Sequence, residues 1–296
     1  MSTLEVQGLG KRFPLRGTGL RREQLDAVSD VSFTLRPGCV TALVGESGSG
    51  KSTVARLLAR LYAPTDGTIL FDGQDVGDQW RRKTLLDYRS RVQMIFQDPF
   101  ASLNPVKRIE HHIARPLQIH GRCKRGQVDG RVRELLGRVG LVPPDEIAQK
   151  YPHQLSGGQR QRVAIARALA VEPSVILADE PISMLDVSIR IGILNLILQL
   201  KRELGIAFLY ITHDIASARY VADEVLVMYR GRIVEQGPTD AVLLDPQHAY
   251  TKLLLSAVPN PESGLRLEPL VRDALPDQSG TQLLEFRPGH YVRRPA

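Results

Sequence analysis

The sequence predicts an α/β fold in which helices cover a mostly parallel β-sheet, together with a small antiparallel sheet and an inserted helical subdomain. Short apolar runs recur along the chain without polar alternation, which is typical of strands buried on both faces. Helical patterns separate several of these runs, as crossover connections between parallel strands do. The runs are Val40–Gly45, Val92–Phe96, Ser174–Asp179, Ala207–Thr212 and Glu224–Tyr229.

The segments before residue 40 have a different pattern. EVQGL and AVSDVSFTL, and later TILFDG, alternate more and are separated by Gly and Pro. Alternation indicates strands with one buried and one solvated face. We therefore expect a small antiparallel sheet beside the main one.

Helices are predicted after the first and third runs, at Val54–Leu61 and Val187–Leu204, the second ending at the stop signal Gly205. Residues 98–165 show helical periodicity and no comparable strand, which predicts a helical subdomain inserted into the core. One face of a helix there would carry Val128, Val132, Leu135, Leu136 and Val139.

Composition excludes several classes of protein. With 296 residues, 43% of them hydrophobic and 24% charged, the chain is of an ordinary globular kind, not disordered, collagenous or coiled coil. It has no apolar run long enough to span a membrane, and its first residues do not resemble a secretory signal. Cys39 and Cys123 are the only cysteines. They are too few for a disulfide framework or a zinc site.

The net charge of +7 is partly local, because residues 107–138 contain nine Lys or Arg against three Asp or Glu. Such a cluster is consistent with an ordinary solvated helical face. Contact with nucleic acid or an anionic membrane surface remains open at this stage.

The strongest motif is GESGSGKS at Gly45–Ser52, which fits the phosphate-loop pattern between a buried strand and an amphipathic helix. Backbone N–H groups in such a loop face phosphate oxygens. Lys51 supplies a charge for the β and γ phosphates, Ser52 a hydroxyl for Mg²⁺, and Thr53 a donor to a phosphate oxygen. The residues predicted to bind ATP here are Gly45, Glu46, Ser47, Gly48, Ser49, Gly50, Lys51, Ser52 and Thr53.

Two acidic residues close the apolar strand VILADE at Val175–Glu180. Ligands of open α/β sheets bind at the carboxyl ends of the strands. We expect Asp179 to hold Mg²⁺, directly or through water. Glu180 is placed to accept a proton from an attacking water, a role worth about 10²–10⁴ in rate.

A second anion-binding helix start is predicted at LSGGQRQR, Leu155–Arg162. Ser156 is a good N-cap, and Gly157 and Gly158 leave backbone N–H groups exposed. One bound ATP does not obviously need two such sites.

With this third motif the sequence resembles the ATP-binding cassette (ABC) family. The resemblance implies a RecA-like P-loop NTPase core and a cassette over residues 1–259. It also implies a head-to-tail dimer that sandwiches two ATP molecules. In that dimer Ser156, Gly157, Gly158 and Gln159 complete the site of the second subunit.

Other motifs typical of the family occur along the chain in the expected order. Gln97 resembles the Q-loop glutamine, which senses Mg²⁺ and the attacking water, and His213 resembles the switch histidine at the γ phosphate. Phe13 resembles the aromatic residue that stacks on adenine. Asp186 resembles the D-loop aspartate that crosses the dimer interface. Met184 departs from the family, where this loop usually has alanine, and is expected to change packing at that interface.

The segment PQHAYTKLLLSAVP, Pro246–Pro259, resembles the one that follows the cassette in the peptide-importer branch, with Ala249 in place of the usual proline. The branch carries oligopeptides, dipeptides, nickel and some oligosaccharides. One type of subunit there has a cysteine-rich segment for an iron–sulfur cluster. Because no cysteine follows Cys123, this chain resembles the partner without it.

The resemblance implies an ATPase that couples ATP hydrolysis to solute import at the cytoplasmic face of the membrane. The implied partners are a second ATPase subunit, a paralogue or a second copy, two transmembrane permease subunits and an extracytoplasmic solute-binding protein. Nucleic acid is not expected. Residues 98–120 would receive a permease helix. The alternative is a non-transport ABC ATPase acting on nucleic acid or ribosomes.

Residues 260–296 are rich in Pro, Gly and Gln. They predict an extended or loosely docked tail, for which regulation, dimerisation or no role are all open.

Overall fold

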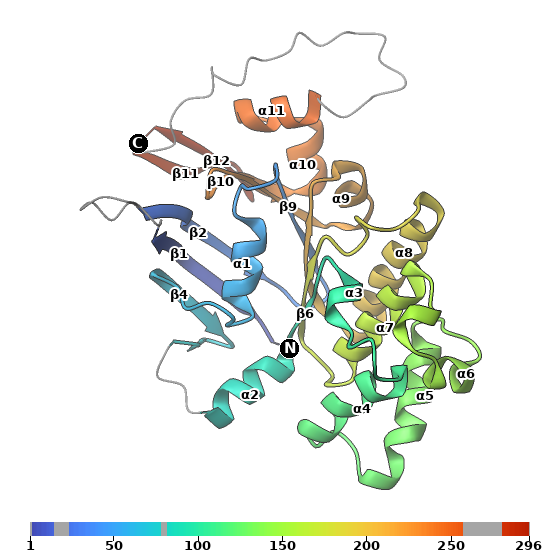
Figure 1. Ribbon diagram of the computed structural model, residues 1–296. Helices are drawn as coiled ribbons and strands as arrows, with labels where there is room; N and C mark the ends of the chain where they lie inside the picture. The colour runs from blue at the N-terminus through green and yellow to red at the C-terminus, as the bar shows by residue number, and fades with distance from the viewer. Residues whose placement is uncertain (1, 15–23, 78–81, 257–279, 296) are drawn as a thin grey trace.

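The computed structural model describes residues 2–14, 24–77, 82–256 and 280–295 (Figure 1). Its centre is an eight-stranded sheet of order β11-β12-β10-β9-β3-β8-β7-β6. The five strands predicted from apolar runs are adjacent in this sheet and pair in parallel. They are β3 (Val40–Val44), β6 (Val92–Ile95), β7 (Val175–Asp179), β8 (Ala207–Thr212) and β9 (Glu224–Tyr229).

The apolar runs reflect burial on both faces of this sheet. Every residue of β3, β7 and β8 is buried. Helices connect the parallel strands: α1 (Lys51–Leu58) follows β3, α8 (Val187–Leu204) follows β7, and α9 (Ile215–Val221) follows β8. Helix α8 ends as predicted, because Gly205 adopts a left-handed conformation with φ 63°.

Helix α1 begins and ends three residues earlier than predicted. It starts directly at Lys51, and Arg60 near its end has a positive φ of 54°. A left-handed residue cannot continue an α-helix. The phosphate loop therefore runs straight into the first helical turn.

The antiparallel sheet has the order β2-β1-β4-β5 and confirms that prediction. It packs with α1 against one face of the main sheet, so that α1 lies between the two sheets (Figure 1). Helix α2 (Arg82–Arg91) then leads into β6. The strands are β1 (Leu4–Pro14), β2 (Gln24–Leu35), β4 (Asp66–Phe71) and β5 (Gln74–Asp75).

The helical insertion lies between β6 and β7 and packs beside the other face of the main sheet (Figure 1). All residues on the predicted apolar face of α5 are at most 5% exposed, so that helix is confirmed. The helices are α3 (Pro99–Ser102), α4 (Ile109–Ile119), α5 (Val128–Arg138), α6 (Pro144–Gln149) and α7 (Gly157–Leu169), with short 3₁₀ turns at Arg125–Gln127 and Pro152–Gln154.

After β9 the chain forms the antiparallel strand β10 (Arg232–Pro238) and two helices, α10 (Thr239–Leu244) and α11 (Ala249–Ser256). Strands β11 (Thr281–Arg287) and β12 (His290–Pro295) then form a hairpin.

The prediction of a loosely docked tail is wrong for residues 281–295. Strand β12 pairs with β10, so the hairpin extends the main sheet. Its side chains explain the docking, because His290 and Arg293 are 2% and 3% exposed and bond to groups of β10. Residues 260–279 of the predicted tail lie outside the described part of the chain.

Candidate functional site

The phosphate-binding loop joins β3 to α1 and touches backbone on both sides. Gly45 has φ 151°, and a Cβ there would lie 2.2 Å from the carbonyl oxygen of Met228. Gly50 has φ 108°, and its Cβ would lie 2.4 Å from the carbonyl oxygen of Ala27. Both positions require glycine, because a side chain would displace backbone on which the loop rests.

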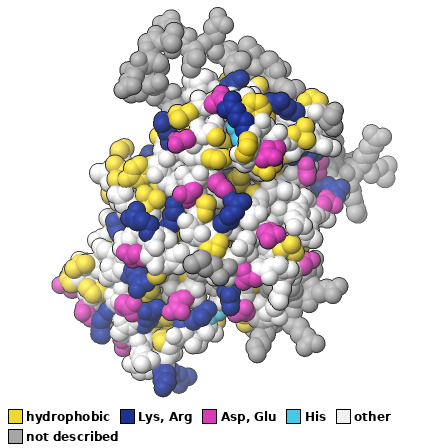
Figure 2. All heavy atoms as spheres, turned by 180° about the vertical axis from the view of Figure 1, so that it is seen from behind, with side chains coloured by type: hydrophobic (Ala, Val, Ile, Leu, Met, Phe, Trp, Pro, Cys, Tyr) yellow, Lys and Arg dark blue, Asp and Glu magenta, His cyan; other side chains and the backbone are white. Residues whose placement is uncertain are grey.

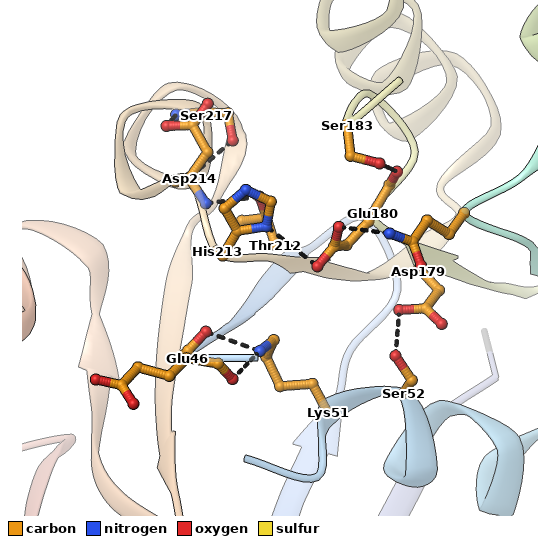
Figure 3. A network of polar contacts seen from close by, with 12 residues as sticks. Glu46, Lys51, Ser52, Asp179, Glu180, Ser183, Thr212, His213, Asp214 and Ser217 are labelled. Carbon is orange, nitrogen blue, oxygen red and sulfur yellow. Dashed lines mark hydrogen bonds and ion pairs between the residues drawn. The ribbon is translucent and has the colours of Figure 1, made fainter. Parts of the chain in front are cut away.

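Lys51 is held inside this loop. Its Nζ donates to the carbonyl oxygens of Gly45 at 2.7 Å and Glu46 at 2.6 Å (Figure 3). Burial lowers the pKa of Lys51, while Glu180 and Asp179 oppose the shift. The ammonium group is thus held at the loop, where a further donor can reach a phosphate oxygen.

Ser52 and Asp179 form a pair at the carboxyl end of β7. The Ser52 hydroxyl donates to Asp179 Oδ1 at 2.9 Å (Figure 3). Burial raises the pKa of Asp179, and the bond from Ser52 opposes the shift. A hydroxyl and a carboxylate oxygen side by side are ligands that Mg²⁺ accepts, so these residues fit the metal predicted for them.

Glu180 follows Asp179 and is the centre of a second cluster. Gln97 Nε2 donates to Glu180 Oε2 at 3.0 Å, and His213 Nδ1 lies 3.1 Å from Glu180 Oε1. Glu180 has φ 45°, a conformation that non-glycine residues rarely adopt. This turn directs the carboxylate toward His213 above the phosphate loop (Figure 3). Three residues predicted separately, from three strand ends, therefore meet at one carboxylate.

A cavity of about 510 Å³ connects the two clusters. Phe13 lies at its edge and packs edge-to-face on Tyr62, with ring centroids 5.5 Å apart. The predicted residues that line the cavity are Phe13, Ser47, Gly48, Gly50, Lys51, Ser52, Thr53, Gln97 and Glu180.

Sequence reasoning missed five lining residues: Leu25, Asp26, Ala27, Arg230 and Gly231. Arg230 and Gly231 form the β9–β10 turn with φ 45° and 80°, and the Gly231 N–H donates to the Ser49 carbonyl at 2.9 Å. The sequence signal for this turn is a glycine between two apolar runs. Residues 25–27 of β2 carry no comparable signal.

The second predicted anion site is a well-formed helix start. Ser156 caps α7 by accepting from the Gln159 N–H at 3.2 Å, and the Gln159 side chain accepts from the Ser156 N–H at 3.0 Å. Gly157 and Gly158 face α8 and the loop before it, because Cβ atoms there would lie 3.4 Å from Leu185 and 2.4 Å from Ile189.

This helix start does not reach the phosphate loop of its own chain. Among the described residues that line the cavity, none belongs to the 156–159 segment, and Asp186, at the start of α8, is exposed and also lies outside it. The structure therefore divides the predicted site residues into two separate surfaces.

Three of the nine basic residues in the cluster at 107–138, Arg131, Arg133 and Arg138, pair with acidic neighbours. Arg131 bridges Glu134 at 2.6 Å and Glu172 at 2.8 Å, and Arg133 contacts Asp145. Basic and acidic side chains are interspersed over the molecular face in Figure 2. These contacts favour an ordinary solvated face for the cluster.

Within the described residues, no helix is both long and apolar enough to cross a membrane.

Two family models match the chain. An ABC transporter model matches residues 28–183. A model described as the oligopeptide/dipeptide transporter C-terminal region matches residues 234–282, part of which lies outside the described residues.

Curated relatives include the glutathione import ATP-binding proteins of Salmonella paratyphi A and Pectobacterium atrosepticum. The first is 47% identical over 304 residues, which cover 99% of this chain and 48% of the relative. The second is 50% identical over 277 residues, which cover 92% and 44%. The chain thus spans about half the length of these relatives.

Solved cassettes share the fold. A dimeric ATP-binding cassette bound to ADP and Pi superposes with a TM-score of 0.70 at 30% identity, covering 80% of this chain and 98% of that one. A cassette from Clostridium perfringens, part of an ABC transporter complex, gives 0.68 at 30% identity, covering 82% and 90%. The predicted fold class is confirmed, and the chain belongs to the ABC transporter family.

Proposed function

We propose that this chain hydrolyses ATP to ADP and phosphate as the ATP-binding subunit of an importer for peptide-like solutes. The observation that carries the proposal is the Glu180 carboxylate, held by Gln97 and His213 beside a phosphate-binding loop. The C-terminal match and the glutathione import relatives support the class of solute.

In this mechanism the phosphate loop and the N-terminus of α1 bind the phosphates. Lys51 stays on the Gly45 carbonyl and donates its other N–H groups to the β and γ phosphates. Phe13 stacks on the adenine ring at the edge of the cavity. Glu180 takes the proton of the attacking water, while Gln97 and His213 orient its two oxygens. His213 also contacts the γ phosphate.

Ser52 and Asp179 would hold Mg²⁺. Gln97 donates to Glu180, the residue after Asp179, and is the residue proposed to sense the metal. When bound, the metal supplies positive charge to the phosphate oxygens. The Ser52 hydroxyl and the Asp179 carboxylate already form a hydrogen bond, so their oxygens need little rearrangement to coordinate the metal.

Two chains would act together, because Ser156–Gln159 and Asp186 are not among the described residues that line the cavity of their own chain. A second copy or a paralogue would present these residues across ATP bound at the first. ATP binding then closes the dimer, and hydrolysis opens it again. The solved dimer bound to ADP and Pi supports this arrangement.

A pocket of about 340 Å³ beside α4 is the proposed docking site for a cytoplasmic helix of the permease subunits. Its lining includes Asn104, His112, Arg115 and Arg167, next to the segment that follows Gln97. A movement of Gln97 would therefore be transmitted through this segment to the permease helix. Docking to a permease there would put the chain at the cytoplasmic face of the membrane, and the proposal includes an extracytoplasmic solute-binding protein as a further partner.

Replacing Glu180 by Gln tests the chemistry. Glu180→Gln should keep ATP binding, because the amide retains the shape of the side chain. It should lower ATP turnover by about 10²–10⁴, because the amide cannot accept the proton. Fluorescent ATP binding and phosphate release measure the two effects. Glu203→Gln, at an exposed residue of α8, is the control. Full ATPase activity of Glu180→Gln would overturn the role of Glu180.

Purification from membranes in mild detergent, followed by mass spectrometry, tests the importer. We expect two multi-span proteins, with or without a second cassette subunit. Recovery with DNA or ribosomes instead would leave the proposed ATP hydrolysis unaffected, would overturn the importer, and would favour the non-transport alternative.

A further inference from the structure

The peptide unit between Gly45 and Glu46 is hydrogen-bonded at both ends. Its carbonyl, on Gly45, accepts from Lys51 Nζ at 2.7 Å. Its N–H, on Glu46, donates to the hydroxyl of Tyr250 at 3.0 Å. A peptide unit is planar, so fixing the N–H also fixes the direction of the carbonyl. Tyr250 is therefore linked to Lys51 through one rigid group.

Tyr250 is itself buried and hydrogen-bonded. It is fully buried, with its ring centroid 4.3 Å from that of Tyr229 on β9, the strand on which Gly45 rests. It lies in the first turn of α11, where its backbone N–H donates to Nδ1 of His248 at 3.1 Å. Ring packing and helix capping thus hold the hydroxyl in place from two sides.

A buried carboxylate anchors the start of this helix. Glu235, on β10, is 0% exposed and accepts from the backbone N–H groups of Gln247 at 2.8 Å and His248 at 3.0 Å. Its Oε1 also lies 2.8 Å from Nε2 of His290 on the C-terminal hairpin. The segment before Tyr250 is therefore bonded to β10 and, through Glu235, linked to β12.

We propose that Tyr250 is a positioning residue for Lys51: its hydroxyl orients the Gly45–Glu46 peptide, whose carbonyl holds the lysine that binds phosphate. The inference rests on the proposed ATP-binding function. It assigns to the C-terminal region a direct role in shaping the nucleotide site of its own chain. The contact joins residues 204 positions apart in the sequence.

Replacing Tyr250 by Phe removes the hydroxyl and keeps the ring. The Glu46 N–H then loses an acceptor in the protein, and the peptide can rotate away from Lys51. We expect the dissociation constant for ATP and KM to rise about three- to tenfold, with a smaller change in kcat. Binding of a fluorescent ATP analogue and steady-state ATP hydrolysis by the full chain measure this split.

Tyr88→Phe is the matched control. Tyr88 is also buried, and its hydroxyl donates to the carbonyl of Leu58 at the far end of α1. This variant loses an equivalent hydrogen bond without touching the loop. It should therefore bind ATP as the unaltered chain does. Thermal unfolding without nucleotide should show comparable stability for both variants.

A double-mutant cycle separates positioning from a general structural effect. If Tyr250 acts through Lys51, Tyr250→Phe should weaken ATP binding much less in a Lys51→Ala background than in the unaltered chain. Equal affinity of Tyr250→Phe and the unaltered chain would overturn the inference, as would full additivity with Lys51→Ala. Failure of the unaltered chain to bind ATP, or no effect of Lys51→Ala alone, would overturn the proposed function instead.

Discussion

At the residue scale, the candidate site depends on side chains whose backbone is constrained in different ways. Glu180 adopts a left-handed conformation directly after β7, and Gly45 and Gly50 allow backbone contacts that no side chain would permit. Strained conformations of this kind concentrate at functional sites, where the surrounding structure maintains them. The surrounding structure therefore fixes the backbone of the candidate site both in the phosphate loop and at the end of β7.

The surroundings of Cys39 lower the reactivity of its thiol. Burial, with Asp223 and Glu224 close by, raises the pKa of its thiol to about 11. Only the thiolate is nucleophilic, and about one Cys39 thiol in a thousand is ionised at pH 8. We expect slow alkylation of Cys39 by iodoacetamide at pH 8, with the rate rising about tenfold per pH unit up to pH 10.

A Cys123→Ser variant leaves Cys39 as the single thiol and makes the measurement unambiguous by mass spectrometry. Asp223→Asn should speed the reaction, because the removed charge opposes the thiolate. Rapid, pH-independent labelling of Cys39 would contradict the expectation.

At the element scale, the contact between α7 and α8 joins the second anion site to the D-loop. A Cβ at Gly158 would lie 2.4 Å from Cγ2 of Ile189, a branched atom close to the backbone that cannot simply swing away. Gly158→Ala should therefore destabilise the chain by about 1–3 kcal/mol, although alanine favours helix more than glycine does.

Urea unfolding measures this change, and Ile189→Ala supplies the control. The double variant Gly158→Ala/Ile189→Ala should lose less stability than the sum of the two single variants, because the clash is absent. Gly137→Ala, on α5, where a Cβ would meet open space, should not destabilise. An additive double variant would show that the helices do not press together at Gly158.

The elements differ in how far the sequence predicts them. Strands β3, β7 and β8 could be predicted because complete burial demands an unbroken apolar run. The hairpin β11–β12 could not, because its buried residues include His290 and Arg293, whose partners on β10 lie more than 50 positions away. Burial through hydrogen bonds leaves no hydrophobic period in the sequence.

The candidate site, too, could be predicted where its residues belong to local patterns, and not where distant segments meet. Lys51, Ser52 and Glu180 belong to short motifs in which spacing and chemistry coincide. Tyr250 belongs to the segment Pro246–Pro259, which resembles the C-terminal region of the peptide-importer branch, but nothing local connects it to Glu46. Leu25 and Ala27 line the cavity only because β2 passes the loop. Tertiary contacts of this kind cannot be predicted from periodicity.

At the scale of the whole molecule, the C-terminal hairpin links parts of the fold that are distant in sequence. It extends one edge of the main sheet, and it reaches the antiparallel sheet through one buried side chain. Arg293 Nε donates to the Ile233 carbonyl at 2.8 Å, and its guanidinium also bonds to the Thr281 carbonyl at 2.9 Å and to Asp30 Oδ2 at 3.0 Å.

Arg293→Met should therefore weaken the whole fold rather than the hairpin alone. The methionine fills part of the space but removes the donor to the buried carbonyl of Ile233, together with the bonds to Thr281 and Asp30, a loss of roughly 3 kcal/mol in the free energy of unfolding. Asp30 can be solvated, since its side chain is 55% exposed. A lower urea midpoint with an unchanged m-value is the expected result.

Arg294→Met is the control, because that neighbour is exposed and should change stability by no more than about 0.5 kcal/mol. Equal effects of the two variants, or loss of the hairpin alone in hydrogen exchange, would show that Arg293 does not connect the two sheets.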